Sequence, residues 1–171
     1  MITCPYCDAD NIEGADLCER CANSLSDMHR PIPASAVERA LLADRVSSLI
    51  SQPPVTAAPD TPLRQVLQLL HARGVGCVVL VEDGRPVGIF TERDVLLKIG
   101  SGAAAAGDQP VAKFMTPNPQ TLPLDANLAF AVQRMDLGGF RHIPIVSADN
   151  ELTGVISVRD ILRHLTETLA E

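Results

Sequence analysis

Four cysteines near the start of the chain have the spacing of a metal site. They form two CxxC pairs, Cys4 with Cys7 and Cys18 with Cys21. A CxxC turn brings two thiolates to one cation, and two such turns complete a tetrahedral shell of four sulfurs. A segment of about 25 residues buries too little surface to fold alone, so a metal must supply its folding free energy. We therefore predict a closed, structural Cys4 site with no open coordination position for catalysis.

Zinc is the predicted metal, and two other uses of these cysteines stay open, a rubredoxin-like iron site and a redox CxxC pair. The fifth cysteine, Cys77, lies in an apolar run and is predicted to be a buried small hydrophobe. The stretch CPYCDADNIEGADLCERCA resembles the short zinc-ribbon family, in which glycine usually follows each CxxC. Asp8 and Ala22 stand at those positions here, which is expected to strain the turns without removing a ligand.

A second pattern occurs twice, a hydroxyl residue followed by an arginine and an aspartate at fixed spacing. The members are Thr91, Arg93 and Asp94 in one copy and Ser157, Arg159 and Asp160 in the other. A hydroxyl that begins a helix lies among free backbone N–H groups at the positive end of the helix dipole, which favours a phosphate. The arginine adds a cation, and the carboxylate can accept both hydrogen bonds of a ribose diol. The same spacing is also a capping box, which binds no ligand.

The two motifs lie at equivalent places in an internal repeat of strand, helix, strand, strand and helix. The first copy has a strand at 54–57, a helix from a capping residue and Pro62 to Gly74, strands at 77–81 and 87–90 around a turn, and a helix at 91–98. The second has a strand at 121–122, a helix from a cap at Asp125 to Gly138-Gly139, strands at 143–146 and 152–156, and a helix capped by Ser157. A helix is predicted at 35–50, and the Gly/Ala-rich segment 100–110 is expected to be mobile.

Each copy alone has too little helix to cover its sheet, so the two are expected to pack sheet to sheet in an α/β (α+β) fold. Four segments of these repeats resemble CBS domains, and the pair resembles a Bateman module. The segments are GIFTERD (Gly88–Asp94), GVISVRD (Gly154–Asp160), RHIPIV (Arg141–Val146) and KFMTPNPQTL (Lys113–Leu122). The predicted organisation is a zinc ribbon at 1–25, a linker at 26–34, a first CBS domain with its leading helix at 35–104, and a second at 105–171.

The resemblance implies two nucleotide clefts, each with ribose and phosphate on one copy and the base against the other. One would use Ser157, Arg159 and Asp160 with Arg141 and His142 near the phosphates, and Val55, Val75 and Gly76 near the base. The other would use Thr91, Arg93 and Asp94, with Thr121, Phe140 and Arg141 near the base. The first copy has Gly76 and Cys77 where the second has Arg141 and His142. The Asp160 cleft is therefore better equipped for a phosphorylated ligand.

Composition and missing motifs argue against three classes of protein: nucleic-acid-binding proteins, membrane-spanning proteins and enzymes. The net charge of −7 argues against a nucleic-acid footprint. No run of about 20 apolar residues or signal peptide is visible, which predicts a cytoplasmic protein with no membrane span. Neither a nucleophile with a His–Asp set nor a P-loop is present, so we expect no enzyme.

The leading hypothesis is a non-catalytic regulatory module that binds an adenine nucleotide or adenosyl ligand and passes the signal to an unknown protein partner. A homodimer is expected through helix faces around Val66–Leu70 and Val132–Leu137. The alternatives are a zinc-ribbon interaction adaptor with vestigial CBS clefts and a rubredoxin-like iron protein.

Overall fold

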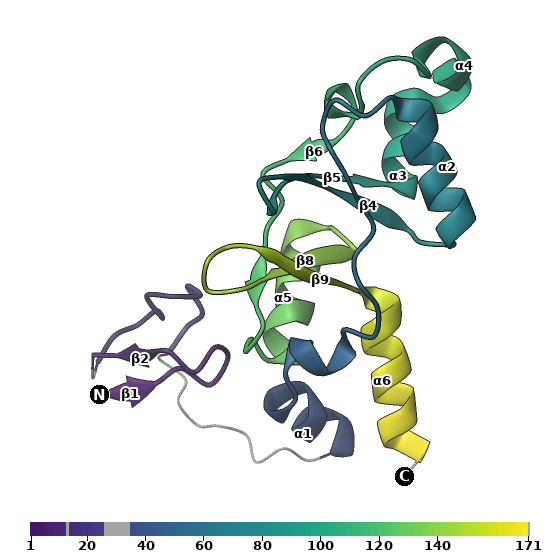
Figure 1. The fold of residues 1–171 in the computed structure, drawn as a ribbon. Coiled ribbons are helices and arrows are strands. Elements are labelled where there is room, and N and C mark those ends of the chain that lie inside the picture. Colours follow the sequence, from purple (N-terminus) through teal and green to yellow (C-terminus); the bar gives the residue numbers. More distant parts are fainter. Residues whose placement is uncertain (13, 26–34, 171) are drawn as a thin grey trace. The chain divides into compact units, whose positions relative to one another are not determined.

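The computed structural model describes residues 1–12, 14–25 and 35–170 (Figure 1). The predicted linker 26–34 lies outside the described residues. The chain divides into two compact units that are interleaved along the sequence. The first, called the helical unit below, contains Met1–Leu49, Leu124–Arg141 and Ile156–Glu171, and the second, called the sheet unit, contains Ile50–Pro123 and His142–Val155.

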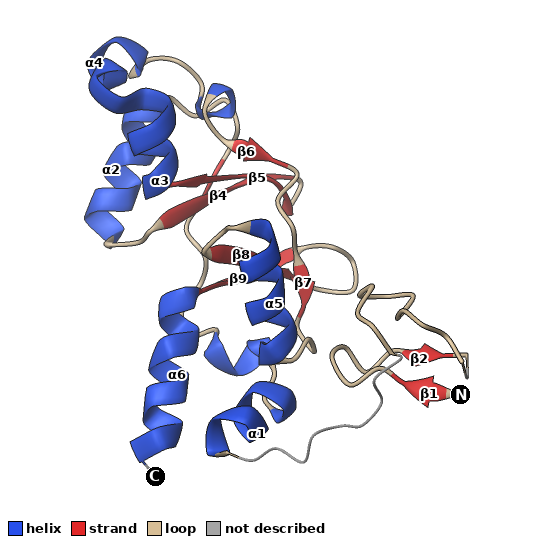
Figure 2. Cartoon of the chain, turned by 180° about the vertical axis from the view of Figure 1, so that it is seen from behind, coloured by secondary structure: helices blue, strands red, loops and turns tan. Residues whose placement is uncertain are grey.

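The sheet unit holds a four-stranded sheet in the order β3-β4-β5-β6. These strands are β3 (Thr56–Ala57), β4 (Cys77–Glu82), β5 (Arg85–Thr91) and β6 (Thr116–Pro117). β3 runs parallel to β4, as the intervening helix α2 (Leu63–Arg73) requires, and the other neighbours are antiparallel. α2 and α3 (Glu92–Asp94) lie on the same side of β4 and β5 (Figure 2).

An apolar core fills the space between this helix layer and the sheet. Val66 of α2 and Val78 and Phe90 of the sheet have no exposed surface. Ala106, in the Gly/Ala-rich segment 100–110, also belongs to this core, as does Val111 just beyond that segment. Part of the segment 100–110 forms the short helix α4 (Ala103–Ala106).

The start of α2 differs from the sequence prediction. Pro62 is the N-cap residue and not the first helical residue, and no side chain caps the helix. The N–H groups of Leu63 and Arg64 instead donate to the carbonyls of Gln109 and Gly107, each at 2.9 Å. A distant backbone segment thus satisfies donors that a capping side chain would otherwise take. Gly74 ends the helix with a φ of 61°, as predicted.

A second sheet has the order β7-β8-β9, with β7 (Leu122–Pro123) parallel to β8 (His142–Val146) and β9 (Leu152–Ser157) at the other edge. Within the sheet unit it meets the first sheet. The N–H of Leu152 donates to the carbonyl of Gly84 at 2.9 Å. The first four residues of β4 are buried on both faces of the strand, as are Ile143–Val146 of β8. Both repeats therefore have the predicted strand and helix order and the predicted sheet-to-sheet arrangement.

The helical unit contains α1 (Ala36–Ala43), α5 (Leu128–Gly138) and α6 (Val158–Ala170), and α1 packs against both other helices. The predicted helix 35–50 is interrupted, because Asp44 is extended with a ψ of 145° and only a short 3₁₀ helix, Val46–Leu49, follows. The predicted cap at Asp125 is also wrong. Asn127 caps α5, and its Oδ1 accepts from the N–H of Phe130 at 2.9 Å.

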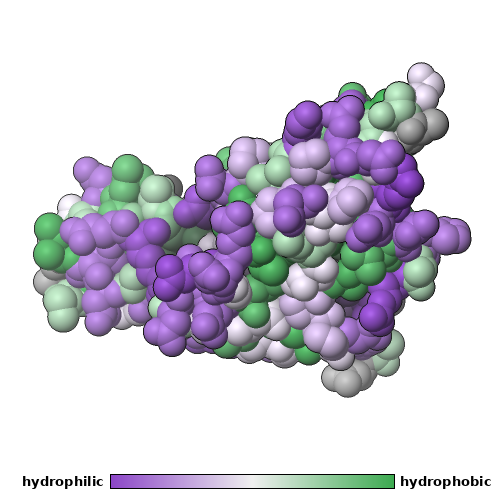
Figure 3. Space-filling view, turned by 45° about the horizontal axis from the view of Figure 1, so that its top comes forward, coloured by the Kyte–Doolittle hydropathy of each residue, from purple (hydrophilic) through white to green (hydrophobic). Residues whose placement is uncertain are grey.

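The two helix faces predicted to form a dimer differ in how much of their apolar side chains is exposed. Val66 and Leu70 are buried in the core, so the face of α2 that contains them is not available, whereas Val132 and Leu137 of α5 are exposed. Hydrophilic side chains cover most of the surface in Figure 3, with smaller apolar patches between them. Among the described residues, no helix combines the length and apolar character that crossing a bilayer requires.

Candidate functional site

The four cysteines at the N-terminus converge on one point. β1 (Ile2–Thr3) pairs with β2 (Asp10–Asn11) and holds the first CxxC turn in a short hairpin. Each turn closes with a backbone bond, from Asp8 to Cys4 at 2.9 Å and from Ala22 to Cys18 at 2.8 Å. All four side chains are buried, although this segment has almost no apolar core of its own.

The sulfur positions fit a tetrahedral metal. The Sγ atoms of Cys4 and Cys21 are 3.6 Å apart, as are those of Cys7 and Cys18, and all four lie within 4.8 Å of one another. Metal–sulfur bonds of about 2.3 Å in a regular tetrahedron place neighbouring sulfurs roughly 3.8 Å apart. Cys4, Cys7, Cys18 and Cys21 can therefore hold one metal ion, as predicted, whereas Cys77 is buried in β4.

The thiols differ in acidity because their surroundings differ. Burial raises the pKa of Cys7 far above its usual range and raises the pKa of Cys21 to about 11. Burial also acts against ionisation of Cys18, but hydrogen bonds from the backbone N–H groups of Cys21 and Arg20 outweigh it and lower the pKa to about 6. Of these three thiols, Cys18 is therefore the most acidic and ionises first as the pH rises.

Metal uptake is expected to release protons at pH 7. Cys7 and Cys21 have raised pKa values and must each lose a proton to become ligands, whereas Cys18 is already a thiolate. The apparent zinc affinity should consequently rise with pH. Calorimetric zinc titrations in buffers of different ionisation enthalpy measure the number of protons released, and heats that do not depend on the buffer would contradict this assignment.

The two hydroxyl–aspartate motifs are both capping boxes. At α3, one oxygen of Asp94, Oδ2, accepts from the N–H of Thr91 at 2.9 Å and from its hydroxyl at 2.7 Å. At α6, Oδ2 of Asp160 accepts from the N–H of Ser157 at 2.8 Å and from its hydroxyl at 2.6 Å. Each motif therefore begins its helix as predicted. The other carboxylate oxygen, Oδ1, is not used in this cap, and its partners determine whether it can accept from a ligand.

The second oxygens are held very differently. Oδ1 of Asp94 pairs with Lys98 Nζ at 2.7 Å, and that ammonium also donates to the carbonyls of Phe114 and Met115 and to the hydroxyl of Thr116. Oδ1 of Asp160 pairs with Arg163 Nη2 at 3.0 Å. The side chain of Asp94 is 11% exposed and that of Asp160 is 25% exposed. The Asp160 carboxylate is therefore the more accessible of the two to a ligand.

Replacing Lys98 with methionine is expected to lower the free energy of unfolding by about 1–3 kcal/mol, because the buried Asp94 charge loses a hydrogen-bonded partner. The matched change Arg163→Met removes a largely exposed partner and should cost less than about 1 kcal/mol. Urea denaturation of both variants measures the difference. Equal losses would show that Lys98 does not fix Asp94 in the way the contacts indicate.

Gly76, predicted near the base, and Arg141, predicted near the phosphates, make equivalent backbone hydrogen bonds in the two repeats. The carbonyl of Gly76 accepts from the N–H of Glu92 at 3.1 Å, and the carbonyl of Arg141 accepts from the N–H of Val158 at 3.0 Å. Gly76 and Arg141 therefore occupy the same place in the two repeats. In the helical unit this bond places the main chain of Arg141 against Val158, the first residue of α6.

In the sheet unit, the His142 ring lies against Gly76. A Cβ added at Gly76 would come within 2.9 Å of Nε2 of His142, so a larger residue there would require the ring to shift. Val55 and Val75 are half-buried against the core of the first repeat. The other predicted residues are placed individually: Arg93 and Arg159 are exposed, Thr121 is half-buried before β7, and the Phe140 ring lies over Gly138.

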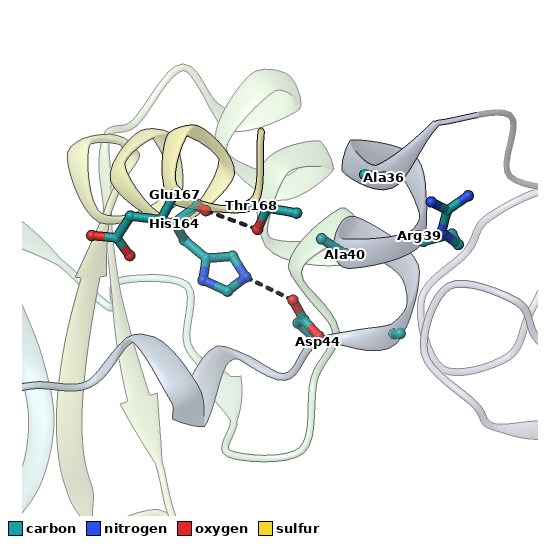
Figure 4. Close-up of a pocket in the computed structure, with 8 residues that line it drawn as sticks. Ala36, Arg39, Ala40, Asp44, His164, Glu167 and Thr168 are labelled. Atoms are coloured by element: carbon teal, nitrogen blue, oxygen red, sulfur yellow. Dashed lines mark hydrogen bonds and ion pairs between the residues drawn. The ribbon is translucent and has the colours of Figure 1, made fainter. Parts of the chain in front are cut away.

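Two features near the motifs were not predicted. Lys98 and Arg163 follow their aspartates by four and three residues, a helical spacing that could have indicated the pairing. A groove of about 480 Å³ between α1 and α6 contains a hydrogen bond of 2.6 Å between His164 Nε2 and Asp44 Oδ2 (Figure 4). His164 lies in the middle of α6.

Comparison with known proteins gives one consistent family. A CBS domain model matches residues 46–101 and 111–167. An uncharacterised 17.7 kDa protein of Acidianus ambivalens is 30% identical over 127 residues, which cover 74% of this chain and 76% of that protein. Other curated relatives are longer, and the chain spans 62% of one from Methanopyrus kandleri and 18% of one from Arabidopsis thaliana.

Solved structures agree with this match. The crystal structure of a CBS-domain-containing protein from Agrobacterium tumefaciens is 31% identical, with a TM-score of 0.65 over 71% of this chain and 98% of that one. A CBS domain protein from Pyrobaculum aerophilum, solved in complex with AMP, is 30% identical, with a TM-score of 0.62 over 72% of this chain and 99% of that one.

Proposed function

The chain belongs to the CBS-domain family, and we propose that it is a non-catalytic regulatory module that binds an adenine nucleotide or related adenosyl ligand at the start of α6. The observation that carries this proposal is the asymmetry of the two motifs. Asp160 is more exposed than Asp94 and pairs with an exposed arginine, and the carbonyl of Arg141 accepts from the N–H of Val158, two residues before Asp160. The AMP complex of the Pyrobaculum relative supports the ligand class.

In this proposal, Asp160 accepts from the ribose hydroxyls, and Ser157, Arg159, Arg141 and His142 bind the phosphates. Val55, Val75 and Gly76 contact the base. Thr91, Arg93 and Asp94, with Thr121 and Phe140, form a second cleft whose motif is held by Lys98 and whose main role is structural. The Cys4 ribbon at 1–25 holds zinc, the CBS domains occupy 35–104 and 105–171, and the protein acts in the cytoplasm as a homodimer with an unidentified protein partner.

A thermal denaturation series tests the ligand class. Zinc-loaded protein is heated with AMP, ADP, ATP or S-adenosylmethionine, and with GMP as the matched control. A ligand at 100 times its Kd stabilises the folded state by about 2.7 kcal/mol, which is a clear rise in the melting temperature. Stabilisation by at least one adenine ligand and not by GMP supports the proposal, and no stabilisation across the series contradicts it.

A second candidate is an interaction adaptor in which both clefts are vestigial. Both aspartates are satisfied by their own helix starts, and this observation favours it. In that case the adenine series gives no stabilisation, while the ribbon still holds its metal. Elemental analysis separates both candidates from the iron alternative, because a colourless protein with one equivalent of zinc excludes a rubredoxin-like site.

A further inference from the structure

The residue after the first CxxC pair makes a contact outside the ribbon. Asp8 and Ala22 occupy the two equivalent turn positions, with φ values of 55° and 58° that glycine adopts more readily. The carboxylate of Asp8 pairs with Arg45 Nη1 at 2.6 Å, whereas the methyl group of Ala22 can form no such pair. Asp8, whose backbone is strained, thus links the ribbon to Arg45, which lies between α1 and the 3₁₀ helix Val46–Leu49.

Two further contacts join the ribbon to α5 and the residues before it. Arg20 donates to the carbonyl of Cys7 at 3.2 Å and lies 3.9 Å from the carboxylate of Asp125. The side-chain amide of Gln133 in α5 donates to Asn23, which directly follows the second CxxC turn. Arg45 also donates to the carbonyl of Asp125 at 3.0 Å, so it bridges the ribbon and the start of α5.

The neighbouring residue, Asp44, makes the corresponding connection to α6. Its carboxylate lies 2.6 Å from Nε2 of His164 (Figure 4), and its carbonyl accepts from the N–H of Leu128 at 3.0 Å. His164 is one helical turn beyond Asp160 on the same helix. Asp44 therefore contacts α6, the helix that begins with the Ser157–Asp160 motif, and its neighbour Arg45 contacts the ribbon.

We propose that Asp44 and Arg45 form a clasp that docks the metal-loaded ribbon on the helical unit and couples its docking to ligand binding at the start of α6. The docking part stands on the contacts alone, and the coupling part rests on the proposed function. Coupling between two sites is reciprocal, so a ligand that favours docking is itself bound more tightly by the docked form. Docking of the ribbon is then the response to ligand binding at the nucleotide site, and both sites belong to the same chain.

Cobalt in place of zinc makes docking directly measurable. Tetrahedral Co²⁺ is paramagnetic and shifts the NMR signals of amides that are held near it, and motion of an undocked ribbon averages these shifts. We expect shifts in α5 when the ribbon and the CBS repeats are present in one chain. Asp8→Gly and Arg45→Ala should each weaken docking about two- to fivefold and reduce the shifts, as for loss of an exposed ion pair.

Ala22→Gly is the matched control, because it relieves the same backbone strain and removes no carboxylate. It should keep the shifts of the parent chain, and the double variant Asp8→Gly/Arg45→Ala should lose no more than either single variant. Asp8→Gly behaving like Ala22→Gly, with the metal still bound, overturns the clasp.

Addition of AMP tests the coupling separately. If amides near Ser157 respond and the cobalt shifts in α5 also change, the coupling is supported, and His164→Ala should remove the second response but not the first. If amides near Ser157 respond while the cobalt shifts stay constant, the coupling is overturned. If no amide responds to AMP, the proposed function and its coupling fail, while the comparison of Asp8→Gly with Ala22→Gly still decides whether the clasp docks the ribbon.

Discussion

Replacing Cys7 with serine is expected to abolish stoichiometric metal binding and to unfold residues 1–25, while the CBS repeats stay folded. The Sγ of Cys7 lies 3.6 Å from that of Cys18, so its loss leaves the tetrahedral shell incomplete. Structural zinc contributes roughly 10–16 kcal/mol to the folding of small zinc domains, far more than the ribbon can replace by apolar burial. Elemental analysis gives the metal content, and hydrogen exchange reports protection of the ribbon amides.

The matched control is Cys77→Ala. Cys77 is also a buried cysteine, but it lies in β4 outside the cluster of four. This variant should keep one equivalent of metal and a protected ribbon. A Cys7→Ser chain that still binds a full equivalent of metal would contradict the assignment of the four ligands.

Replacing Asp160 with asparagine is expected to weaken AMP binding by about 10–100-fold, because a hydrogen bond to a charged group contributes about 1.5–3 kcal/mol. Asparagine keeps one carbonyl oxygen, which can still accept from the N–H and hydroxyl of Ser157. The cap of α6, and with it the fold, should therefore survive the change. Equilibrium titration of the purified variant with AMP measures the loss.

Asp94→Asn is the control for this change, since it makes the same substitution in the other repeat. Lys98 and the small exposure of Asp94 indicate a structural role there, so AMP affinity should stay close to that of the parent chain. A greater loss of affinity in Asp94→Asn than in Asp160→Asn would reverse the assignment of the two motifs.

Local patterns in the sequence were sufficient for much of the fold. The strand and helix order of both repeats, the left-handed glycines that end α2 and α5, and the capping residues Thr91 and Ser157 all follow from neighbours within a few positions. The Cys4 cluster was equally predictable, because two CxxC turns leave few arrangements other than one metal. These features depend on short-range spacing, which a sequence displays directly.

Apart from the Asp94–Lys98 and Asp160–Arg163 pairs, which have a local helical spacing, the features that were missed depend on distant partners. Pro62 could replace a capping residue at α2 only because Gly107 and Gln109 supply carbonyl groups from far along the chain. The break at Asp44 follows from contacts with His164 and Leu128, and Arg45 contacts Asp8 in the ribbon. No spacing rule connects such residues, so neither the clasp nor the groove beside it could be inferred before the fold was known.

The two hydroxyl–aspartate motifs have matching residue types, but the sequence does not show how differently their aspartates are held. Both copies have a hydroxyl residue, an arginine and an aspartate in register, and both form the same cap. What distinguishes them is the cation after each aspartate and the surroundings of that cation. Lys98 donates to three further groups of residues 114–116, whereas Arg163 is largely exposed.

Calorimetric titration of the zinc-loaded protein with AMP measures the nucleotide site itself. We expect saturable binding at one strong site per chain, weakened by Asp160→Asn and retained in Asp94→Asn. Absence of saturable binding of AMP, with ADP, ATP and S-adenosylmethionine equally silent, would contradict it.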